Sequence, residues 1–260
     1  MLARVLPLLF RTLLLVASSA TGFTEHNRER AGRGALAHAL RLGLLASFVV
    51  LAMGACGGGS GGGGGAQQGP QAHALPKQGK PLAPGEYQTK VFEPGMSFSV
   101  GKGWMAALPE TRDAVALFEQ NGPTLIGILN VQKVYDPSHP EEPLKPAPED
   151  MLSWLQEHPR LEVEPPSRVS VGGVSGQQFD AIASEPKKGP EFCSEPCVPL
   201  FYITNNNNFW VGKSEKYRFI VLGDVKGQEV TILFGGPAVE FDESVPKAQK
   251  VLDTIKWEGA

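Results

Sequence analysis

The chain has few of the residues that usually carry chemistry. Its 260 residues include 3 cysteines and 5 histidines, and only 8% of the residues are aromatic. It contains no H-E-x-x-H zinc motif, no P-loop and no Rossmann glycine pattern. Its carboxylate pairs fall in expected loops or first helical turns, where solvation and capping explain them: Glu141-Glu142, Glu149-Asp150 and Asp242-Glu243. These absences favour a non-catalytic protein that holds no metal and no other cofactor, although active-site residues often converge from distant positions.

The chain also lacks clusters of basic residues. The net charge of the whole chain is −3. The first 55 residues carry six arginines against two glutamates, which leaves 18 Lys/Arg and 25 Asp/Glu, a net charge of −7, in the remainder. Affinity for nucleic acid comes largely from clustered Lys and Arg, so an acidic domain of this kind is not expected to bind nucleic acid.

No apolar run is long enough to cross a membrane. The two apolar segments, residues 5–20 and 44–53, fall short of the roughly 20 residues that a transmembrane helix needs. The second has the length of a signal-peptide core and follows three arginines, Arg30, Arg33 and Arg41. We therefore expect a signal peptide, with an uncleaved signal anchor as the alternative. The first segment indicates either a misassigned start or an extra interfacial helix.

The residues after this apolar run carry a specific resemblance. Met53-Gly54-Ala55-Cys56 is similar to the lipobox of bacterial lipoproteins, with Met at the position where Leu is usual. The resemblance implies cleavage before Cys56 and acylation of that cysteine, with fatty acids such as palmitate. Two or more acyl chains anchor a protein stably, whereas one chain is marginal. The expected location is therefore the extracytoplasmic face of the cell membrane, with the membrane itself as a partner through the lipid.

Glycine dominates the stretch that follows. Residues 57–65 are eight glycines and one serine, a composition typical of a flexible coil. We expect an N-terminal extension and lipoprotein signal peptide over residues 1–55, a Gly/Gln/Pro-rich tether over residues 56–84, and one globular domain over residues 85–260.

The two remaining cysteines, Cys193 and Cys197, form a CSEPC sequence in a loop that contains proline. Outside the cytoplasm such a pair can persist as a disulfide, which is the expectation here. Free thiols and half of a metal site are the alternatives, and the latter is disfavoured because a zinc site needs about four ligands.

The expected fold is α+β, an antiparallel sheet of about seven to nine strands flanked by two helices. Alternating or apolar runs bounded by turn residues predict strands at residues 96–100, 114–118, 124–134, 168–171, 177–183, 199–204, 209–212, 217–225 and 228–235. The last four are expected to form a meander. Helical spacing predicts helices over residues 149–158 and from an N-cap at Ser244 to Trp257. The proline-rich segment 136–148 is expected to be a surface crossover without regular structure.

One glycine-rich turn invites a catalytic interpretation. Residues 172–176, GGVSG, resemble the G-x-S-x-G nucleophile elbow but are out of register with it, since Gly176 directly follows Ser175. A simple turn between two strands explains this segment better.

A second resemblance covers residues 87–257. The order of elements and the patches SFSVGKGW, SVGGVSG and VLDTIKW are similar to small actinobacterial lipoproteins of the PsbP-like class. That class has an α/β/α sandwich, and its members are mostly non-enzymatic binding or assembly factors. The resemblance implies an architecture and carries over no functional residue.

Three functions agree with these features. The first is a non-catalytic binding or assembly module at the cell envelope, which would use the concave side of the sheet or the loop 136–148 to hold an envelope protein or a small molecule. The second is a small-ligand carrier or hydrolase with a pocket between sheet and helix, lined by groups such as Tyr202, Tyr217 and Arg218. The third is a structural lipoprotein of the envelope.

Overall fold

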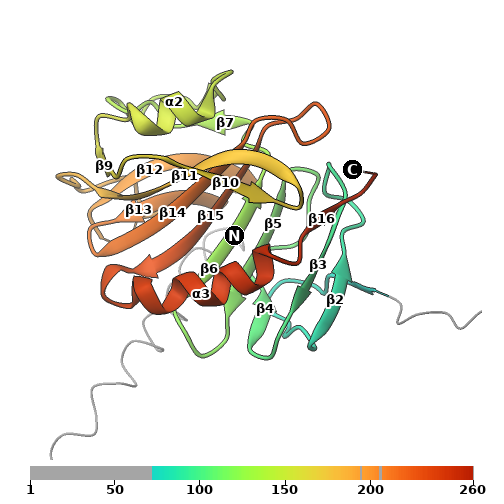
Figure 1. Ribbon diagram of the computed structural model, residues 1–260. Helices are drawn as coiled ribbons and strands as arrows, with labels where there is room; N and C mark the ends of the chain where they lie inside the picture. The colour runs from blue at the N-terminus through green and yellow to red at the C-terminus, as the bar shows by residue number, and fades with distance from the viewer. Residues whose placement is uncertain (1–71, 194, 205–206, 260) are drawn as a thin grey trace, which may run out of the picture. The chain divides into compact units, whose positions relative to one another are not determined.

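The computed structural model describes residues 72–193, 195–204 and 207–259 of the chain (Figure 1). The expected signal peptide, Cys56 and the glycine run lie outside these residues. The described part reaches back into the expected tether, because residues 73–74 pair with a strand of the domain and Leu82 is buried in its core.

A sheet of eight antiparallel strands forms the centre of the domain. Its order is β10-β11-β14-β15-β6-β5-β4, and β9 pairs with the far end of β11. This confirms the α+β class and the expected antiparallel sheet. The strands are β4 (Trp104–Ala106), β5 (Ala114–Glu119), β6 (Leu125–Leu129), β9 (Leu161–Val163), β10 (Ser167–Val171), β11 (Val174–Ala183), β14 (Glu215–Leu222) and β15 (Val230–Pro237).

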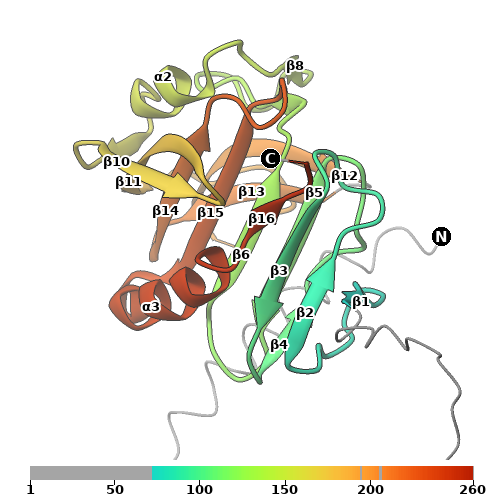
Figure 2. The same ribbon diagram turned by 45° about the vertical axis from the view of Figure 1, so that its right-hand side comes forward.

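One face of the central sheet packs against helix α3 (Phe241–Leu252) and a smaller sheet (Figures 1 and 2). The smaller sheet has the order β1-β2-β3-β16, so the last strand of the described chain pairs with an early one. Ala248, Val251 and Leu252 of α3 are buried in this layer. The strands are β1 (His73–Ala74), β2 (Gly85–Gln88), β3 (Met96–Val100) and β16 (Lys256–Trp257), and the 3-10 turn η1 (Ala238–Glu240) precedes α3.

The opposite face packs against a third sheet and helix α2 (Met151–Gln156). This sheet has the order β13-β12-β7-β8, and aromatic side chains such as Phe201, Phe209 and Phe219 pack between it and the central sheet. The strands are β7 (Lys133–Val134), β8 (Lys145–Pro146), β12 (Cys197–Thr204) and β13 (Asn207–Gly212).

The expected strand 124–134 is in fact two strands in two sheets. β6 ends at Leu129, Asn130 interrupts the apolar run, and β7 begins at Lys133 in the third sheet. The Asn130 side-chain amide donates hydrogen bonds to the carbonyl oxygens of Glu93 and Arg112. A buried polar residue that bonds to the backbone therefore holds the crossing between layers.

The expected four-stranded meander is wrong for a related reason. β12 and β13 pair in the third sheet, whereas β14 and β15 pair in the central sheet. The chain changes layers at the turn after Gly212, and both strands of each hairpin are apolar enough to be buried. The proline-rich segment also contains a short strand, since β8 pairs with β7.

The turn between β10 and β11 contains only Gly172 and Gly173, with φ angles of 58° and 83°. Positive φ at both central positions is the geometry of a type I′ hairpin, which glycine adopts without steric cost. Ser175 is therefore a strand residue paired with Ser170. The turn interpretation is confirmed, although the turn is shorter than expected.

Both helices are shorter than expected. Asp150 is the N-cap of α2, where its side chain accepts a hydrogen bond from the backbone N–H of Ser153. Ser244 is not an N-cap: it lies inside α3, buried, and its hydroxyl donates to the carbonyl oxygen of Glu240. α3 ends at Leu252, so that Lys256 and Trp257 are free to pair with β3.

Candidate functional site

Two pockets lie in the part of the domain built around the third sheet and α2. We call them the proline-loop pocket and the Asn130 pocket. The proline-loop pocket has a volume of about 690 Å³ and is lined by Tyr135, Pro137, Ser138, Pro140, Glu141, Glu142, Pro159, Arg160, Lys187, Lys188, Gly189, Pro190 and Phe192. The Asn130 pocket has a volume of about 510 Å³ and is lined by Arg112, Asp113, Asn130, Val131, Gln132, Pro148, Glu149, Met151, Gln228, Glu229 and Thr231.

Asp136 organises the loop that forms one wall of the proline-loop pocket. Its carboxylate accepts hydrogen bonds of 2.8 Å from the backbone N–H groups of both Ser138 and His139, and it pairs with the ammonium group of Lys145. These bonds to the charged form hold the pKa of the Asp136 carboxyl well below its usual range, with the Lys145 hydrogen bond as the largest cause. Lys145 lies in β8, so the ion pair ties the loop to the end of the third sheet.

The disulfide between Cys193 and Cys197 supports the opposite wall. Residues 187–192 pass directly over it: the N–H of Cys197 donates to the carbonyl oxygen of Lys187, and the N–H of Cys193 donates to that of Pro190. A Cβ atom at Gly189 would lie 2.5 Å from the Cys197 sulfur, so only glycine allows this approach. The expected disulfide is present in the structure, and it shapes the pocket.

Two aromatic rings give the pocket an apolar part. Tyr135, which is buried, and Phe192 lie with ring centroids 5.5 Å apart. The Tyr135 hydroxyl donates to the side-chain oxygen of Asn208 at 2.8 Å. Burial, with a smaller contribution from Tyr202, raises the pKa of Tyr135 to about 12, so this hydroxyl stays neutral.

Arg160 brings a positive charge to the same pocket, near Lys187 and Lys188. Its guanidinium donates to the carbonyl oxygen of Cys197 at 3.1 Å, and burial lowers the pKa of the group below its ordinary value. Its backbone N–H donates to Nδ1 of His158, so Nε2 of that ring carries the proton. His158 is 3% exposed, and burial followed by the charge of Arg160 lowers its pKa to about 4.

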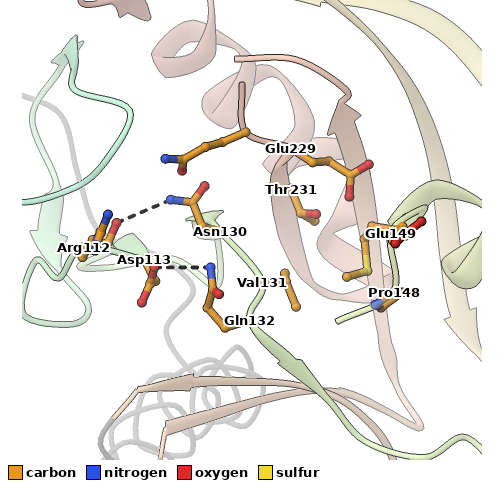
Figure 3. Close-up of a pocket in the computed structure, with 11 residues that line it drawn as sticks. Arg112, Asp113, Asn130, Val131, Gln132, Pro148, Glu149, Glu229 and Thr231 are labelled. Carbon is orange, nitrogen blue, oxygen red and sulfur yellow. Dashed lines mark hydrogen bonds between the residues drawn. The ribbon is translucent and has the colours of Figure 1, made fainter. Parts of the chain in front are cut away.

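The Asn130 pocket is built from the backbone crossing described above (Figure 3). Its side chains come from the loop before β5, the β6–β7 crossing, the start of α2 and the start of β15. Gln132 donates a long hydrogen bond of 3.5 Å to Asp113. Burial raises the pKa of the Glu229 carboxyl above its ordinary value, and the charge of Asp150 adds to the rise, whereas the N–H of Met151 donates to the carboxylate and opposes it.

The three residues that we expect to line a pocket between sheet and helix do not converge. Tyr217 and Arg218 are neighbours on β14 and therefore point to opposite faces of the sheet. Tyr217 packs edge-on against Phe209 in the layer under the third sheet, whereas Arg218 forms a two-point ion pair with Asp180, with bonds of 2.6 and 3.0 Å. Tyr202 lies beside Lys133 in the third sheet. None of the three lines either pocket.

The sequence did not single out most of the residues that line the pockets. Glu141 and Glu142 belong to the loop 136–148, which the sequence predicts as one possible binding surface, whereas Glu149 is predicted only as a solvated or helix-capping carboxylate; each lines a pocket. The available signals were the proline-rich segment for one pocket and a lone asparagine interrupting an apolar run for the other. Asp242 and Glu243 lie in the first turn of α3, which begins before the N-cap predicted at Ser244.

Two absences hold for the described residues alone. Among residues 72–259, less positions 194, 205 and 206, no group of three His, Cys, Asp or Glu side chains is placed to hold a metal ion. In the same residues no helix combines the length and the apolar character that a membrane crossing requires. The acylation predicted at Cys56 falls outside this part of the chain.

The chain matches no protein-family model and no curated protein sequence. Among solved structures it is similar to the crystal structure of LpqN, which is involved in cell envelope biogenesis of Mycobacterium tuberculosis. The identity is 11%, the match covers 68% of this chain and 88% of LpqN, and the TM-score is 0.30. A likeness at this level indicates nothing about the function of this chain.

Proposed function

We propose that this protein is a lipid-anchored, extracytoplasmic binding module that holds its ligand in the proline-loop pocket. The observation that carries the proposal is the make-up of that pocket: two aromatic rings, four prolines and three basic side chains around about 690 Å³. Clefts of this size that combine apolar walls with a few polar groups are typical of ligand sites.

The lining indicates what kind of ligand fits. Tyr135 and Phe192 offer ring surface, while Arg160, Lys187 and Lys188 offer positive charge. Arg160 in particular is partly buried, where a charge-assisted hydrogen bond is stronger than in water. The ligand class is therefore a molecule or peptide segment with an apolar part and an acidic group. Glu141 and Glu142 at the rim disfavour a ligand of uniformly high negative charge.

The walls are fixed before any ligand arrives. The Asp136 hydrogen bonds hold one wall and the disulfide holds the other. A preformed pocket loses less conformational entropy on binding than a flexible loop would. This supports a binding role for the loop 136–148 rather than a role as a mere spacer.

The anchor is tested by mass. Full-length protein extracted from the producing cells should begin at Cys56 and carry added acyl chains, and Cys56→Ala should leave an unprocessed, unacylated chain. Cys193→Ala serves as the matched control, since it removes a cysteine without touching the lipobox. An unmodified N-terminus at Met1 in the wild-type protein would contradict the anchor and leave the pocket untouched.

The pocket is tested by photo-crosslinking in intact cells. A photoreactive amino acid at position 138, in the pocket, should give a discrete adduct that disappears when Phe192→Ala is added. The same amino acid at position 250, on the exposed side of α3, is the matched control and should give no such adduct. Equal crosslinking from positions 138 and 250, or an adduct insensitive to Phe192→Ala, would refute binding at this pocket.

The same variants distinguish a carrier from a protein-binding module, and a deletion tests a purely structural role. A small-molecule carrier would give an adduct of low mass at position 138, and a protein partner an adduct of high mass. Cells that keep the anchored N-terminus but lack residues 85–260 would behave as wild type if the anchored N-terminal part alone carried a structural role.

A further inference from the structure

The Asn130 pocket has a feature that the fold does not explain. Asn130 is 6% exposed, and its amide nitrogen is occupied by the carbonyl oxygens of Glu93 and Arg112. Its side-chain oxygen Oδ1 is buried and has no hydrogen-bond partner among the described residues. Figure 3 shows the amide nitrogen directed toward Arg112 and the oxygen turned away from that residue.

An unpartnered buried acceptor costs free energy, about 1 to 3 kcal/mol. Such groups in native proteins call for an explanation, and a ligand that donates a hydrogen bond is one. The amide cannot turn over to relieve the cost, because its oxygen would then face two carbonyl oxygens.

The charges around Asn130 specify the donor. The pocket is lined by three carboxylates, Asp113, Glu149 and Glu229, and by one guanidinium, Arg112. Arg112 is mostly exposed and pairs with Glu93 at 2.8 Å, so its charge is already balanced outside this set. The amides of Gln132 and Gln228 and the hydroxyl of Thr231 can donate or accept, so the charged groups of the lining present a net negative charge to any occupant.

Glu229 strengthens this interpretation. It lies directly before β15 and is about half-buried, and the Met151 N–H donates to its carboxylate without neutralising the charge. The described side chains around the pocket place no lysine or histidine beside it. A bound cation would supply a positive partner.

We propose that the Asn130 pocket is a second binding site, which takes a small ligand with a protonated primary amine. The ammonium group has three donors and no acceptor, which matches Oδ1 of Asn130 together with the pocket carboxylates. A volume of about 510 Å³ accommodates a chain of several heavy atoms, so a diamine or an amino alcohol fits. The site shares no lining residue with the proline-loop pocket and does not depend on its ligand.

The experiment is a titration of the full-length protein with 1,4-diaminobutane, followed by calorimetry and by the NMR signals of side-chain amides. We expect saturable binding and a shift of the Asn130 amide signal. The uncharged 1,4-butanediol, which has the same length, should bind at least about tenfold more weakly, because a hydrogen bond to a charged group contributes about 1.5 to 3 kcal/mol.

Glu229→Gln removes the charge and keeps an acceptor for the Met151 N–H, and it should weaken diamine binding about tenfold or more. Glu164→Gln is the matched control, since Glu164 is an exposed carboxylate paired with Lys216 outside the pocket, and it should leave the affinity unchanged. If Glu229→Gln fails to fold, Asp113→Asn is the second test. Three results would overturn the proposal: equal binding of the diol, an affinity unchanged in the folded variant, or no saturation below about 10 mM, which corresponds to about 2.7 kcal/mol of binding free energy.

Discussion

The two pockets lie in one domain but are built in different ways. The proline-loop pocket consists of loop segments held by a disulfide and by the Asp136 hydrogen bonds, with few paired strands in its walls. The Asn130 pocket is lined mostly by residues that adjoin β5, β6, α2 and β15, with Met151 of α2 and Thr231 of β15 inside those elements, and it contains a buried amide that bonds to the backbone. We therefore expect the proline-loop pocket to change with solution conditions, whereas the Asn130 pocket should persist as long as the domain is folded.

The two pockets should differ most in stability under mild acid. His158 precedes the wall residues Pro159 and Arg160, and its pKa is lowered to about 4 from an ordinary value near 6.5. The unfolded chain therefore takes up a proton at higher pH than the folded one, and stability falls as the pH drops from about 6.5 toward 4. The difference between these two pKa values corresponds to about 3 kcal/mol of unfolding free energy. We expect urea unfolding to show this loss, with the walls of the proline-loop pocket exchanging hydrogen first.

His158→Asn is the control for this pH effect. An asparagine oxygen can still accept from the Arg160 N–H, but it does not titrate between pH 4 and 7. The variant should be less stable at neutral pH because the larger ring no longer packs against Trp154, yet its stability should change less between pH 6.5 and 4. An unchanged pH dependence would show that His158 is not the responsible group.

The Asn130 pocket should respond to a change in its amide. Asn130→Ala removes the donor to the carbonyl oxygens of Glu93 and Arg112 and opens a small void, at an expected cost of roughly 2 to 3 kcal/mol. Because the amide holds the crossing from β6 to β7, this cost should appear as a loss of global stability in denaturant unfolding. Gln132→Ala, an exposed neighbour in the same crossing, is the control and should change stability by less than about 0.5 kcal/mol. Equal effects of the two changes would contradict the assigned role.

Removing the disulfide should affect the two pockets differently, and this difference should be clearer than the loss of stability. Closing a loop of this length contributes about 2 kcal/mol in the chain-entropy model. The double variant Cys193→Ala, Cys197→Ala should lose crosslinking from position 138, because residues 187–192 lose their support. Diamine binding at the Asn130 pocket should stay within about twofold of wild type. Loss of both activities together would mean that the pockets are not independent.

The smallest effect is local. Asp136→Asn keeps the size of the side chain but weakens its bonds to the Ser138 and His139 N–H groups and removes the ion pair with Lys145. The lowered pKa of Asp136 means that the wild-type loop loses the same contacts only in strong acid, below the ordinary range near pH 4. Amide signals of residues 136–142 should shift and broaden in the variant at neutral pH, while the melting temperature changes little. Unchanged signals would show that contacts other than those of Asp136 hold the loop in place.

Much of the fold follows from patterns in the sequence. The alternation of MSFSV predicts β3, and the apolar stripe with Pro159 after it predicts α2. The hairpin at Gly172 and the cysteine bridge also follow from local chemistry. Local patterns succeed where the residues themselves dictate the geometry.

What the sequence does not reveal is which layer each strand joins. An apolar strand such as β12 or β15 satisfies its pattern equally well in either sheet, and only tertiary packing decides between them. The prediction that Tyr217 and Arg218 line one pocket is wrong for the same reason, because the two residues are adjacent in sequence yet face different layers. Pockets formed by loops from distant positions, as with Arg160 and Phe192, leave no local signature.

Hydrogen exchange of the full-length protein in its native membrane tests the central claim most directly. The claim is that the anchored domain binds a ligand through the proline-loop pocket and that this binding is separate from the Asn130 pocket. Relative to purified protein in lipid vesicles, residues 136–142 and 187–192 should be protected in native membranes, and Phe192→Ala should abolish the protection. Exchange in these segments that is equal in both preparations, or protection that survives Phe192→Ala, would contradict the claim.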